Sequence, residues 1–425
     1  MARLDSRGRP IVVVTGAGVV TSLGQGKSNN WQRLVAGESG IGRIARFPID
    51  GLKTTIAGTC DFARRPGDAA PDLSYNLAEL AVDEALVEAG IGRPGDFPGP
   101  LFMAVPPVEL EWAGRFTLAD EIAGGADPSY ARAMAGPASR HPDWLAKFAF
   151  GGVADRLAER FGTKGSPISL STACASGATA IQLAVEAIRR GECEAAIAGG
   201  TDGSIHAEAL IRFSLLSALS TANDVPSAAS KPFSKNRDGF VMAEGGAALV
   251  LESLDHALER GARVLGVLAG CGERADSFHR TRSNPDGKAI VGAIENALAD
   301  AGLTPDRIDY VNAHGTGTPE NDKMEHFACA AVFGERMKRL PISSNKSMIG
   351  HTLTAAGAVE AVVSLMTIAN GVLPPTINHH VPDPAIDLDV VANASRPATV
   401  GAVMSNSFGF GGQNVVLVLT AEPTT

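Results

Sequence analysis

The stretch SPISLSTACASGATAIQLAVEAI, residues 166–188, predicts a short strand, a turn of small residues and a helix with apolar residues at helical spacing. A second stretch, LPISSNKSMIGHTLTAAGAVEAV at residues 340–362, has the same order and character. Each is followed by a further strand that ends in small residues, EAAIAGGT in the first case and TVGAVMSNSFG in the second. This internal repeat predicts two similar α/β halves whose helix N-termini meet near the middle of the molecule.

Other segments of the chain agree with an α/β fold. Further strands are expected at 11–20 and 307–317. Helical periodicity occurs in four segments, each of which stops at a glycine: 77–90, 180–191, 289–302 and 356–371. Apolar strands that alternate with helices of this length indicate buried parallel or mixed sheets. Residues 105–150 are charged and loop-like, and we expect an insertion that either caps a pocket or is an ordinary surface excursion.

Composition limits the class of protein. The 425 residues are 45% hydrophobic and 20% charged, and the net charge of −9 argues against nucleic acid or an anionic membrane as the main partner. The five cysteines (60, 174, 193, 271 and 329) are odd in number and form no CxxC pair, which is typical of free thiols in a reducing cytosol. No apolar run approaches the ~20 residues that span a bilayer. We therefore expect a soluble cytoplasmic protein.

Two glycine-rich stretches resemble nucleotide-binding motifs without completing them. GAGVVT (16–21) has Thr21 where the third glycine of a dinucleotide fingerprint belongs. TSLGQGKS (21–28) has the same threonine where a phosphate loop has its first glycine. We expect no nucleotide cofactor.

Cys174 lies at the junction of the strand and the helix in the first repeat, and two interpretations of it are open. Free cysteine is among the most buried residue types, so Cys174 could be a packed structural thiol. A helix N-terminus also stabilises a thiolate and lowers its pKa, which would make Cys174 a nucleophile. Backbone N–H groups at the same place could hold the oxyanion of an acyl transfer.

Two histidines occupy comparable turns. His314 follows a strand in NAHGTGTPEND (312–322), and Lys346 precedes His351 by five residues in NKSMIGHTLTAAGAVE (345–360). Two imidazoles could donate hydrogen bonds to one carbonyl oxygen and stabilise an enolate. Acidic residues near His314 (Glu320, Asp322 and Glu325) show no convincing metal-ligand pattern, so we predict no metal.

SNSFGFGGQN (405–414) places two phenylalanines among glycines, where they either close over an apolar ligand or form a simple turn.

Taken in this order, these residues resemble the β-ketoacyl-acyl carrier protein synthases, the condensing enzymes of fatty acid synthesis in the thiolase superfamily. The resemblance covers nearly the whole chain and includes VVVTGAGVVTSLG, TACASGATAI, AIAGGTD, PFSKNRDGFVMAEGGAALVLE, YVNAHGTGTPEND, NKSMIGHTLTAAGAVEA, LPPTIN and SNSFGFGGQN. The Cys-His-His set is that of the elongating type I/II branch and is synthase II-like. The resemblance implies a duplicated αβαβα layered fold with mixed five-stranded sheets. It divides the chain into halves at 1–260, with the inserted cap at 105–150, and 261–425.

The resemblance also implies roles for individual residues. Cys174 would carry the acyl chain, and His314 and His351 would hold the malonyl thioester carbonyl while CO₂ leaves. The N–H groups of Cys174 and Phe410 would form the oxyanion hole. Lys346 would support the histidines, with Glu360 as the buried acid near it, and Thr316 and Thr318 would bind phosphopantetheine. Phe410, with Phe408 beside it, would form a gate. Arg64 and Arg65 would belong to a patch that binds the carrier protein.

The implied reaction lengthens an acyl chain by two carbons with no cofactor beyond the phosphopantetheine of the substrates. Its partners would be acyl- and malonyl-loaded carrier protein and a second copy of the chain in a homodimer. Residues 105–150 and Gln413 depart from the family pattern, which leaves the preferred acyl chain open. The alternatives are a very-long-chain or polyketide ketosynthase and, from another class, a non-catalytic chain-length-factor-type partner, which would lack the cysteine.

Overall fold

The computed structural model describes residues 4–93, 95–123 and 140–423. The strands are β1 Val12–Thr21, β2 Gly24–Gln25, β3 Gly42–Arg43, β4 Ile56–Ala57, β5 Leu101–Ala104, β6 Ile168–Leu170, β7 Ala195–Asp202, β8 Gly245–Ser253, β9 Gly266–Ala275, β10 Tyr310–Asn312, β11 Pro341–Ser343, β12 Val372–Leu373, β13 Asp389–Val390, β14 Arg396–Pro397, β15 Ala402–Phe408 and β16 Gln413–Thr420. The α-helices are α1 Lys27–Val35, α2 Ala70–Ala89, α3 Trp112–Ala123, α5 Asp143–Phe148, α6 Gly152–Phe161, α7 Ser176–Arg189, α8 Ala207–Leu215, α9 Leu254–Glu259, α10 Lys288–Ala301, α11 Pro319–Phe333, α12 Lys346–Ile349 and α13 Ala356–Asn370.

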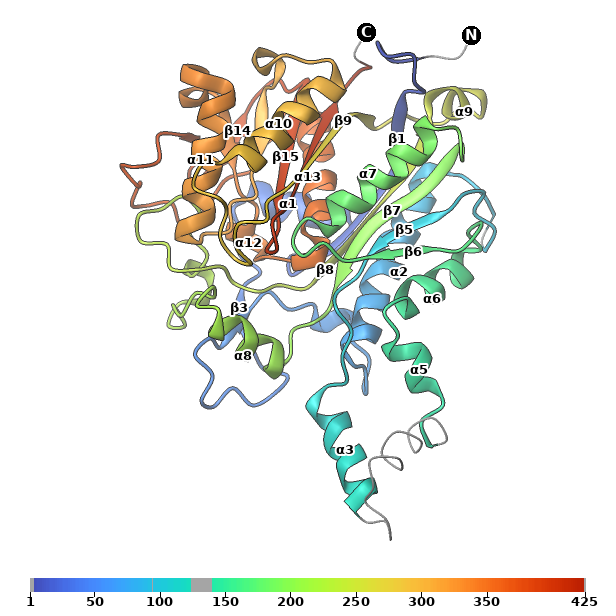
Figure 1. Ribbon diagram of the computed structural model, residues 1–425, viewed down its shortest axis with the longest axis vertical. Helices are drawn as coiled ribbons and strands as arrows, with labels where there is room; N and C mark the ends of the chain where they lie inside the picture. The colour runs from blue at the N-terminus through green and yellow to red at the C-terminus, as the bar shows by residue number, and fades with distance from the viewer. Residues whose placement is uncertain (1–3, 94, 124–139, 424–425) are drawn as a thin grey trace.

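The main sheet of the described residues has 12 strands, and all but β2 and β13 form two sets of five strands with the same topology (Figure 1). In the first set the order is β6-β5-β7-β8-β1, and in the second it is β11-β10-β15-β16-β9. Both sets have two parallel pairs followed by two antiparallel pairs. The sets join where β1 pairs with β9, at Val13↔Val267 and Val14↔Gly266. This repetition confirms the duplicated fold with mixed five-stranded sheets.

Helices α7 and α13 lie between the two sets of strands and pack against each other. A Cβ on Gly177 would lie 2.6 Å from the Ala358 nitrogen, and a Cβ on Gly357 would lie 2.6 Å from the Ala178 nitrogen. Glycine at both positions therefore allows the backbones to approach closely, which explains the small-residue composition of both repeats. The helix N-termini meet near the middle of the molecule, as the repeat predicted.

Two further layers of helices cover the outer faces of the sheet. Helix α2 packs on β1, β7 and β8 together with α6, and α10 packs on β9 and β16 together with α11. The arrangement gives the expected five layers, α/β/α/β/α. One helical stretch, 353–370, is apolar and long enough to span a membrane, which the sequence prediction missed, but 83% of it is buried inside the protein.

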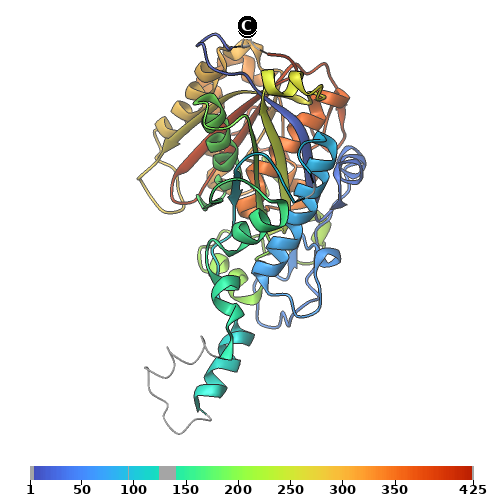
Figure 2. The same cartoon turned by 90° about the vertical axis from the view of Figure 1, so that its right-hand side faces the viewer.

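The inserted region 105–150 differs from its prediction as loop-like sequence. It contains helices α3 and α5, which project away from the layered body as an arm in two perpendicular views (Figures 1 and 2). Among the described residues of the arm, α5 contacts α2 and α6 of the body. Residues 124–139 lie outside the described residues. No described residue of either helix is buried, and α3 has no apolar stripe along one face, which explains why no helical periodicity was visible in this region.

Candidate active site

Cys174 lies between the end of β6 and the start of α7, as the sequence predicted. The turn contains Ala173 with a φ of +51°, a left-handed conformation that is rare for a residue with a side chain. Ser176 holds the turn, because its hydroxyl accepts from the Thr172 N–H at 2.8 Å and donates to the Ala173 carbonyl at 2.5 Å. These contacts aim the thiol, which is 9% exposed, away from the helix and into a cavity.

The expectation of a lowered thiol pKa is wrong for this structure. Burial raises the pKa of Cys174 to about 11, although a hydrogen bond from the Phe410 backbone N–H and the charge of Lys346 act in the opposite direction. Desolvation exceeds these contributions because the sulfur is shielded from water. The thiol is therefore protonated at neutral pH, and the Phe410 N–H is directed at its sulfur.

His314 follows β10 in a loop that a carboxylate holds in place. Glu325 accepts from the backbone N–H groups of His314 and Gly315, at 2.8 and 2.7 Å. Lys346 Nζ lies 3.5 Å from His314 Nδ1 and donates to the His314 carbonyl at 2.6 Å. An ammonium group only donates, so Nδ1 is the acceptor and Nε2 of His314 carries the hydrogen.

His351 reaches the same cavity from the end of α12. Its backbone N–H donates to the Val241 carbonyl at 2.7 Å, which fixes the residue against a neighbouring segment. The Leu353 N–H donates to His351 Nδ1 at 3.3 Å, so the hydrogen of this imidazole is also on Nε2. Among the described residues, this buried Nε2 has no hydrogen-bond partner.

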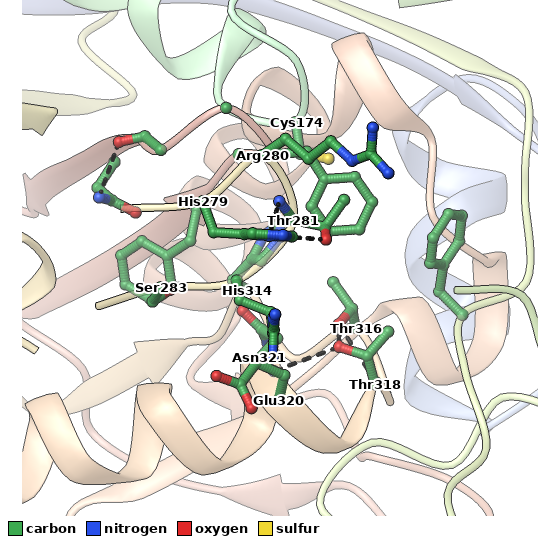
Figure 3. Close-up of a pocket in the computed structure, with 18 of the residues that line it drawn as sticks. Cys174, His279, Arg280, Thr281, Ser283, His314, Thr316, Thr318, Glu320 and Asn321 are labelled. Atoms are coloured by element: carbon green, nitrogen blue, oxygen red, sulfur yellow. Dashed lines mark hydrogen bonds between the residues drawn. The ribbon is translucent and has the colours of Figure 1, made fainter. Parts of the chain in front are cut away.

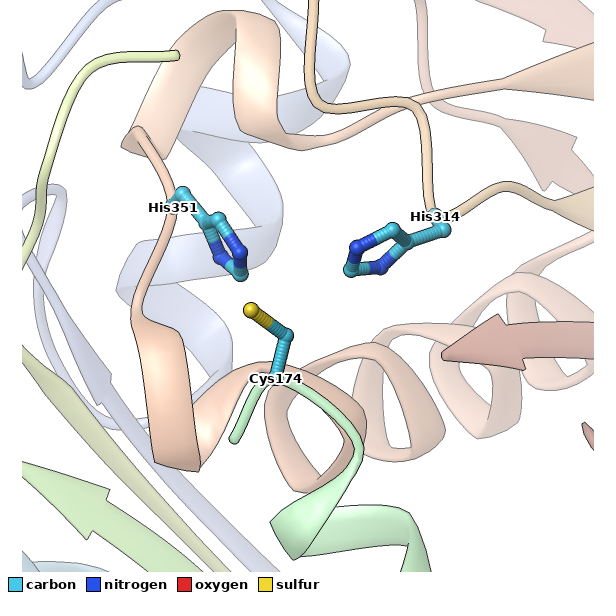
Figure 4. Close-up of side chains that lie close together, drawn as sticks. All are labelled: Cys174, His314 and His351. Atoms are coloured by element: carbon cyan, nitrogen blue, oxygen red, sulfur yellow. The ribbon is translucent and has the colours of Figure 1, made fainter. Parts of the chain in front are cut away.

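The three side chains face one another across a small space (Figure 4). Cys174 Sγ and one ring nitrogen from each histidine all lie within 4.8 Å of one another, and the imidazole centroids are 5.4 Å apart. Burial, with a contribution from the Lys346 charge, lowers the pKa of both His314 and His351 well below 6.5. Both rings are neutral, and each presents an N–H to the space beside the sulfur.

Lys346 and Glu360 form a buried ion pair behind His314. Nζ of Lys346 pairs with Oε1 of Glu360, and each residue is 1% exposed. Burial raises the pKa of Glu360 to about 7, although Lys346 acts to lower it. The structure thus brings together the lysine, the acid and the histidine that the sequence analysis grouped, with the lysine touching His314 directly.

Two acids near His314 have a use that the sequence analysis missed. Glu325 binds the His314 loop and accepts from the Asn406 side chain at 2.9 Å. Asp322 accepts from the Gly317 N–H at 3.1 Å and from the Phe233 N–H at 2.7 Å. The 11-residue spacing of Glu325 from His314 gives no local signal, because a loop and the first turns of α11 separate them.

Cys174 lines a cavity together with residues of the segment 279–283 (Figure 3). Its free volume is only about 50 Å³, and its walls include Thr316, Thr318, Phe408 and Phe410. The two threonine hydroxyls are 2.9 Å apart and face the cavity, and Thr318 is the N-cap of α11. Phe410 lies in a loop where Gly411 and Gly412 both have a φ of +87°.

The residues at the outer part of this cavity include a loop that sequence reasoning missed. The cavity is lined by Arg280 and Arg282, and the Gly411 N–H donates to the Arg280 carbonyl at 2.8 Å. The expected carrier residues lie elsewhere: Arg64 lines a separate cavity, and the exposed Arg65 lies 3.8 Å from Glu79. No family motif drew attention to the 276–283 segment, so only the fold reveals it.

Within the described part of the chain, Cys174, His314 and His351 are also the one group of three side chains with the spacing of potential metal ligands. The absence of a metal from the reaction stays a prediction.

A buried thiol at a helix N-terminus, faced by neutral imidazole N–H donors and a backbone N–H, is suited to acyl transfer with stabilisation of an oxyanion. The layered duplicated fold and this site together define a condensing enzyme of the thiolase-like class.

Comparisons with known proteins give the family. Residues 9–73 and 69–257 match the family described as Beta-ketoacyl synthase, N-terminal domain, and residues 265–380 match Beta-ketoacyl synthase, C-terminal domain. A 3-oxoacyl-[acyl-carrier-protein] synthase 2 from Coxiella burnetii is 37% identical, over 96% of this chain and 98% of that protein. A putative polyketide beta-ketoacyl synthase 1 from Streptomyces cyaneus is 36% identical, over 96% and 97%.

Solved structures agree with this result. A ketosynthase in complex with its type II polyketide acyl-carrier protein has a TM-score of 0.85 and 32% identity, over 97% of this chain and all of that chain. A beta-ketoacyl synthase from Burkholderia phymatum has a TM-score of 0.84 and 31% identity with the same coverage. The chain belongs to the β-ketoacyl synthase family, and it is an enzyme rather than a non-catalytic partner.

Proposed function

We propose that this protein lengthens an acyl chain by two carbons, through decarboxylative condensation of a malonyl thioester with an acyl group held on Cys174. The observation that carries the proposal is the meeting of Cys174 Sγ with one nitrogen each of His314 and His351 within 4.8 Å. A nucleophile and two neutral N–H donors in one enclosed space supply what both steps of this reaction require.

In the first step, Cys174 Sγ attacks the carbonyl carbon of an acyl thioester. The new C–S bond forms as the carrier C–S bond breaks, and the thiol proton of Cys174 ends on the departing carrier thiol. Because burial raises the Cys174 pKa to about 11, the thiol loses its proton only as it attacks. The N–H groups of Cys174 and Phe410 stabilise the oxyanion of the tetrahedral intermediate.

In the second step, malonyl thioester occupies the space beside the histidines. Its thioester carbonyl oxygen accepts hydrogen bonds from Nε2–H of His314 and Nε2–H of His351. The C–C bond to the carboxylate breaks, CO₂ leaves, and the electron pair forms an enolate that these donors stabilise. The enolate carbon attacks the acyl carbonyl, the bond to Cys174 breaks, and the sulfur takes up one proton from solvent.

The substrates are proposed to arrive on an acyl carrier protein through a phosphopantetheine arm. Thr316 and Thr318 line the passage to Cys174 and have hydroxyls that suit the amide groups of that arm. Phe410, with Phe408 beside it, would open the passage. Arg280 and Arg282 line the outer part of this passage, and an acidic carrier protein would be attracted to them. Arg64 and Arg65 are the second candidate for the carrier-protein patch, and Arg64 lines a different cavity.

The assembly and location are proposed from the family. We propose a cytoplasmic homodimer in which each chain has two halves, 1–260 and 261–425. We propose that it has no nucleic acid or membrane as partner and no cofactor of its own. The five described cysteines are free, which suits a reducing compartment. A molar mass in solution of twice 43.8 kDa is the result expected for the dimer.

Fatty acid elongation is the first candidate pathway and polyketide or very-long-chain synthesis is the second. Relatives named for fatty acid synthesis and relatives named for polyketide synthesis are 37% and 36% identical to this chain. The inserted arm at 105–150 is the feature that favours a specialised branch, because its base lies next to the cavity that contains Cys174.

The experiment is chain extension with carrier proteins loaded with acyl groups of graded length, together with malonyl carrier protein. We expect products two carbons longer, detected by mass spectrometry. Cys174→Ala should abolish them, and Cys193→Ala should not, because Cys193 is a half-buried thiol outside every cavity that Cys174 lines. Absence of extension at all lengths by the wild-type protein would contradict the proposal.

A further inference from the structure

Two cavities lie side by side behind Cys174. The first, here called the acyl cavity, has a volume of about 380 Å³ and is lined by Cys174, Ala209, Phe213, Leu216 and Leu353, among others. The second, here called the arm cavity, has a volume of about 410 Å³ and is lined by apolar residues that include Phe47, Leu73, Ile205, Trp112 and Phe116. Its lining also includes the charged residues Arg46, Arg64, Asp68, Glu111 and Glu208. Each volume falls within the ~300–1,000 Å³ typical of ligand pockets, and both sets of walls are largely apolar.

His206 lines both cavities and forms the boundary between them. It is the N-cap of α8, where its Nδ1 accepts from the Ala209 N–H at 3.4 Å. Two carboxylates lie close to the ring nitrogens. Its Nδ1 is 3.0 Å from Glu208, and its Nε2 is 3.5 Å from Glu109.

The charged boundary is tied to the inserted arm. Glu109 belongs to the inserted segment and also pairs with Arg212 of α8, at 2.9 Å. Glu208 accepts from the Trp112 N–H at 2.6 Å, at the first residue of α3. The Ala70 N–H of α2 donates to Glu111 at 2.7 Å. The base of the arm therefore forms both the boundary and the outer wall of the arm cavity, while the rest of α3 projects outward (Figure 2).

The apolar wall of the arm cavity calls for an apolar occupant. Trp112 and Phe116 are 42% and 65% exposed, although large aromatic side chains are stabilised by cover from water. An acyl chain that starts at Cys174 fills the acyl cavity first, and the walls of this cavity include His206. A longer chain that passes this side chain enters an apolar space of similar volume.

We propose that the arm cavity is the distal part of the acyl-chain site, and that His206 marks the boundary between two classes of acyl chain. Shorter chains occupy the acyl cavity alone, and longer chains pass His206 and occupy both cavities. The proposal rests on the proposed function. In this proposal the base of the inserted arm determines the length of the acyl chain, and the substrates are carrier proteins loaded with long acyl chains.

The test fills the arm cavity from its exposed wall. Ala113 lines this cavity on α3, and Ala119 lies on the same helix outside the lining, so Ala113→Trp and Ala119→Trp form a matched pair. For each variant, kcat/KM is measured with acyl carrier proteins of graded chain length. One methylene in an apolar pocket changes kcat/KM by ~10–200-fold. We expect Ala113→Trp to lower the long-to-short ratio at least ~10-fold, and Ala119→Trp to leave it unchanged.

A second variant changes the boundary itself. His206→Ala removes the ring between the cavities, so we expect the long-to-short ratio to rise. An unchanged ratio in both Ala113→Trp and His206→Ala, or a wild-type enzyme that extends short chains only, would overturn the inference and leave the proposed function standing. If the wild type extends no chain at all, the proposed function fails instead.

The oligomeric state of Ala113→Trp, measured by sedimentation, tests the other occupant of the arm cavity. A second copy of the chain seated there would make the variant dissociate while its chain-length ratio stayed the same. That outcome would contradict the inference, whereas an unchanged mass with a lowered ratio supports it.

Discussion

Replacing Lys346 by methionine removes both the partner of Glu360 and the positive charge beside His314, and the two effects can be measured separately. Lys346 and Glu360 are each 1% exposed, and removal of one partner from such a buried pair costs ~3–5 kcal/mol of unfolding free energy. The pKa of Glu360 is already about 7 in the presence of the lysine. Without it the carboxyl takes up a proton more readily, which places the expected loss near the lower end of that range.

The chemical effect of Lys346→Met comes through His314. The ammonium group lies 3.5 Å from Nδ1 and keeps the hydrogen of the ring on Nε2. When the lysine is lost, the ring can place its hydrogen on either nitrogen, and the malonyl carbonyl loses a fixed donor. Loss of one donor from an oxyanion site lowers kcat by ~10²–10³-fold. We expect a decrease of this size in condensation and a smaller one in acylation of Cys174.

The assay measures the two steps separately. Acylation is followed by rapid quench and mass spectrometry of the intact protein, condensation by product formation from the isolated acyl-enzyme, and stability by chemical unfolding. The control is Lys346→Met/Glu360→Gln, which removes the buried acid and should regain much of the stability without regaining condensation. If the double variant recovered condensation as well, Lys346 would serve only to neutralise Glu360, and the reasoning about His314 would be refuted.

Three further predictions concern the thiol, the His314 loop and the helix contact. Alkylation of Cys174 by iodoacetamide should become about tenfold faster per pH unit up to about pH 11, because burial raises its pKa; a plateau near pH 7 would contradict this. Glu325→Gln leaves one backbone N–H of the loop without a carboxylate oxygen, so stability should fall by ~1–3 kcal/mol and malonyl decarboxylation should slow; wild-type values in both measurements would contradict this. Gly357→Ala places a Cβ 2.6 Å from a backbone nitrogen of α7, so unfolding should show a loss of ~1–3 kcal/mol; an unchanged midpoint would show that the helices shift at no cost.

The sequence singled out Cys174, His314 and His351 because each lies in a turn of small residues that follows a predicted strand. Cys174 and His351 both lie in the segments that join strand to helix in the two repeats, and His314 follows β10, so a duplicated sheet brings all three to one place. Their shared position could therefore be inferred before any contact was known.

Properties that depend on burial and on distant contacts could not be inferred in this way. The pKa of Cys174 was predicted in the wrong direction, because a sequence shows the helix N-terminus and does not show how much water reaches the sulfur. The places of Glu325, Arg280 and His206 depend on the fold. Glu325 bonds to the distant His314 loop, and Arg280 and His206 line cavities together with residues from other elements. The arm at 105–150 was predicted as loop-like because its helices lack the apolar stripe of a core helix.

The central claim is that Cys174 carries the acyl chain that is then extended. Its most direct test is a single turnover: the protein is acylated with an isotope-labelled acyl carrier protein, the acyl-enzyme is purified and mapped by peptide mass spectrometry, and malonyl carrier protein is added. The account predicts label on the peptide that contains Cys174, followed by its transfer to a β-ketoacyl product two carbons longer with release of one CO₂. Label on another residue, or label that remains on Cys174 after malonyl carrier protein is added, would contradict the account.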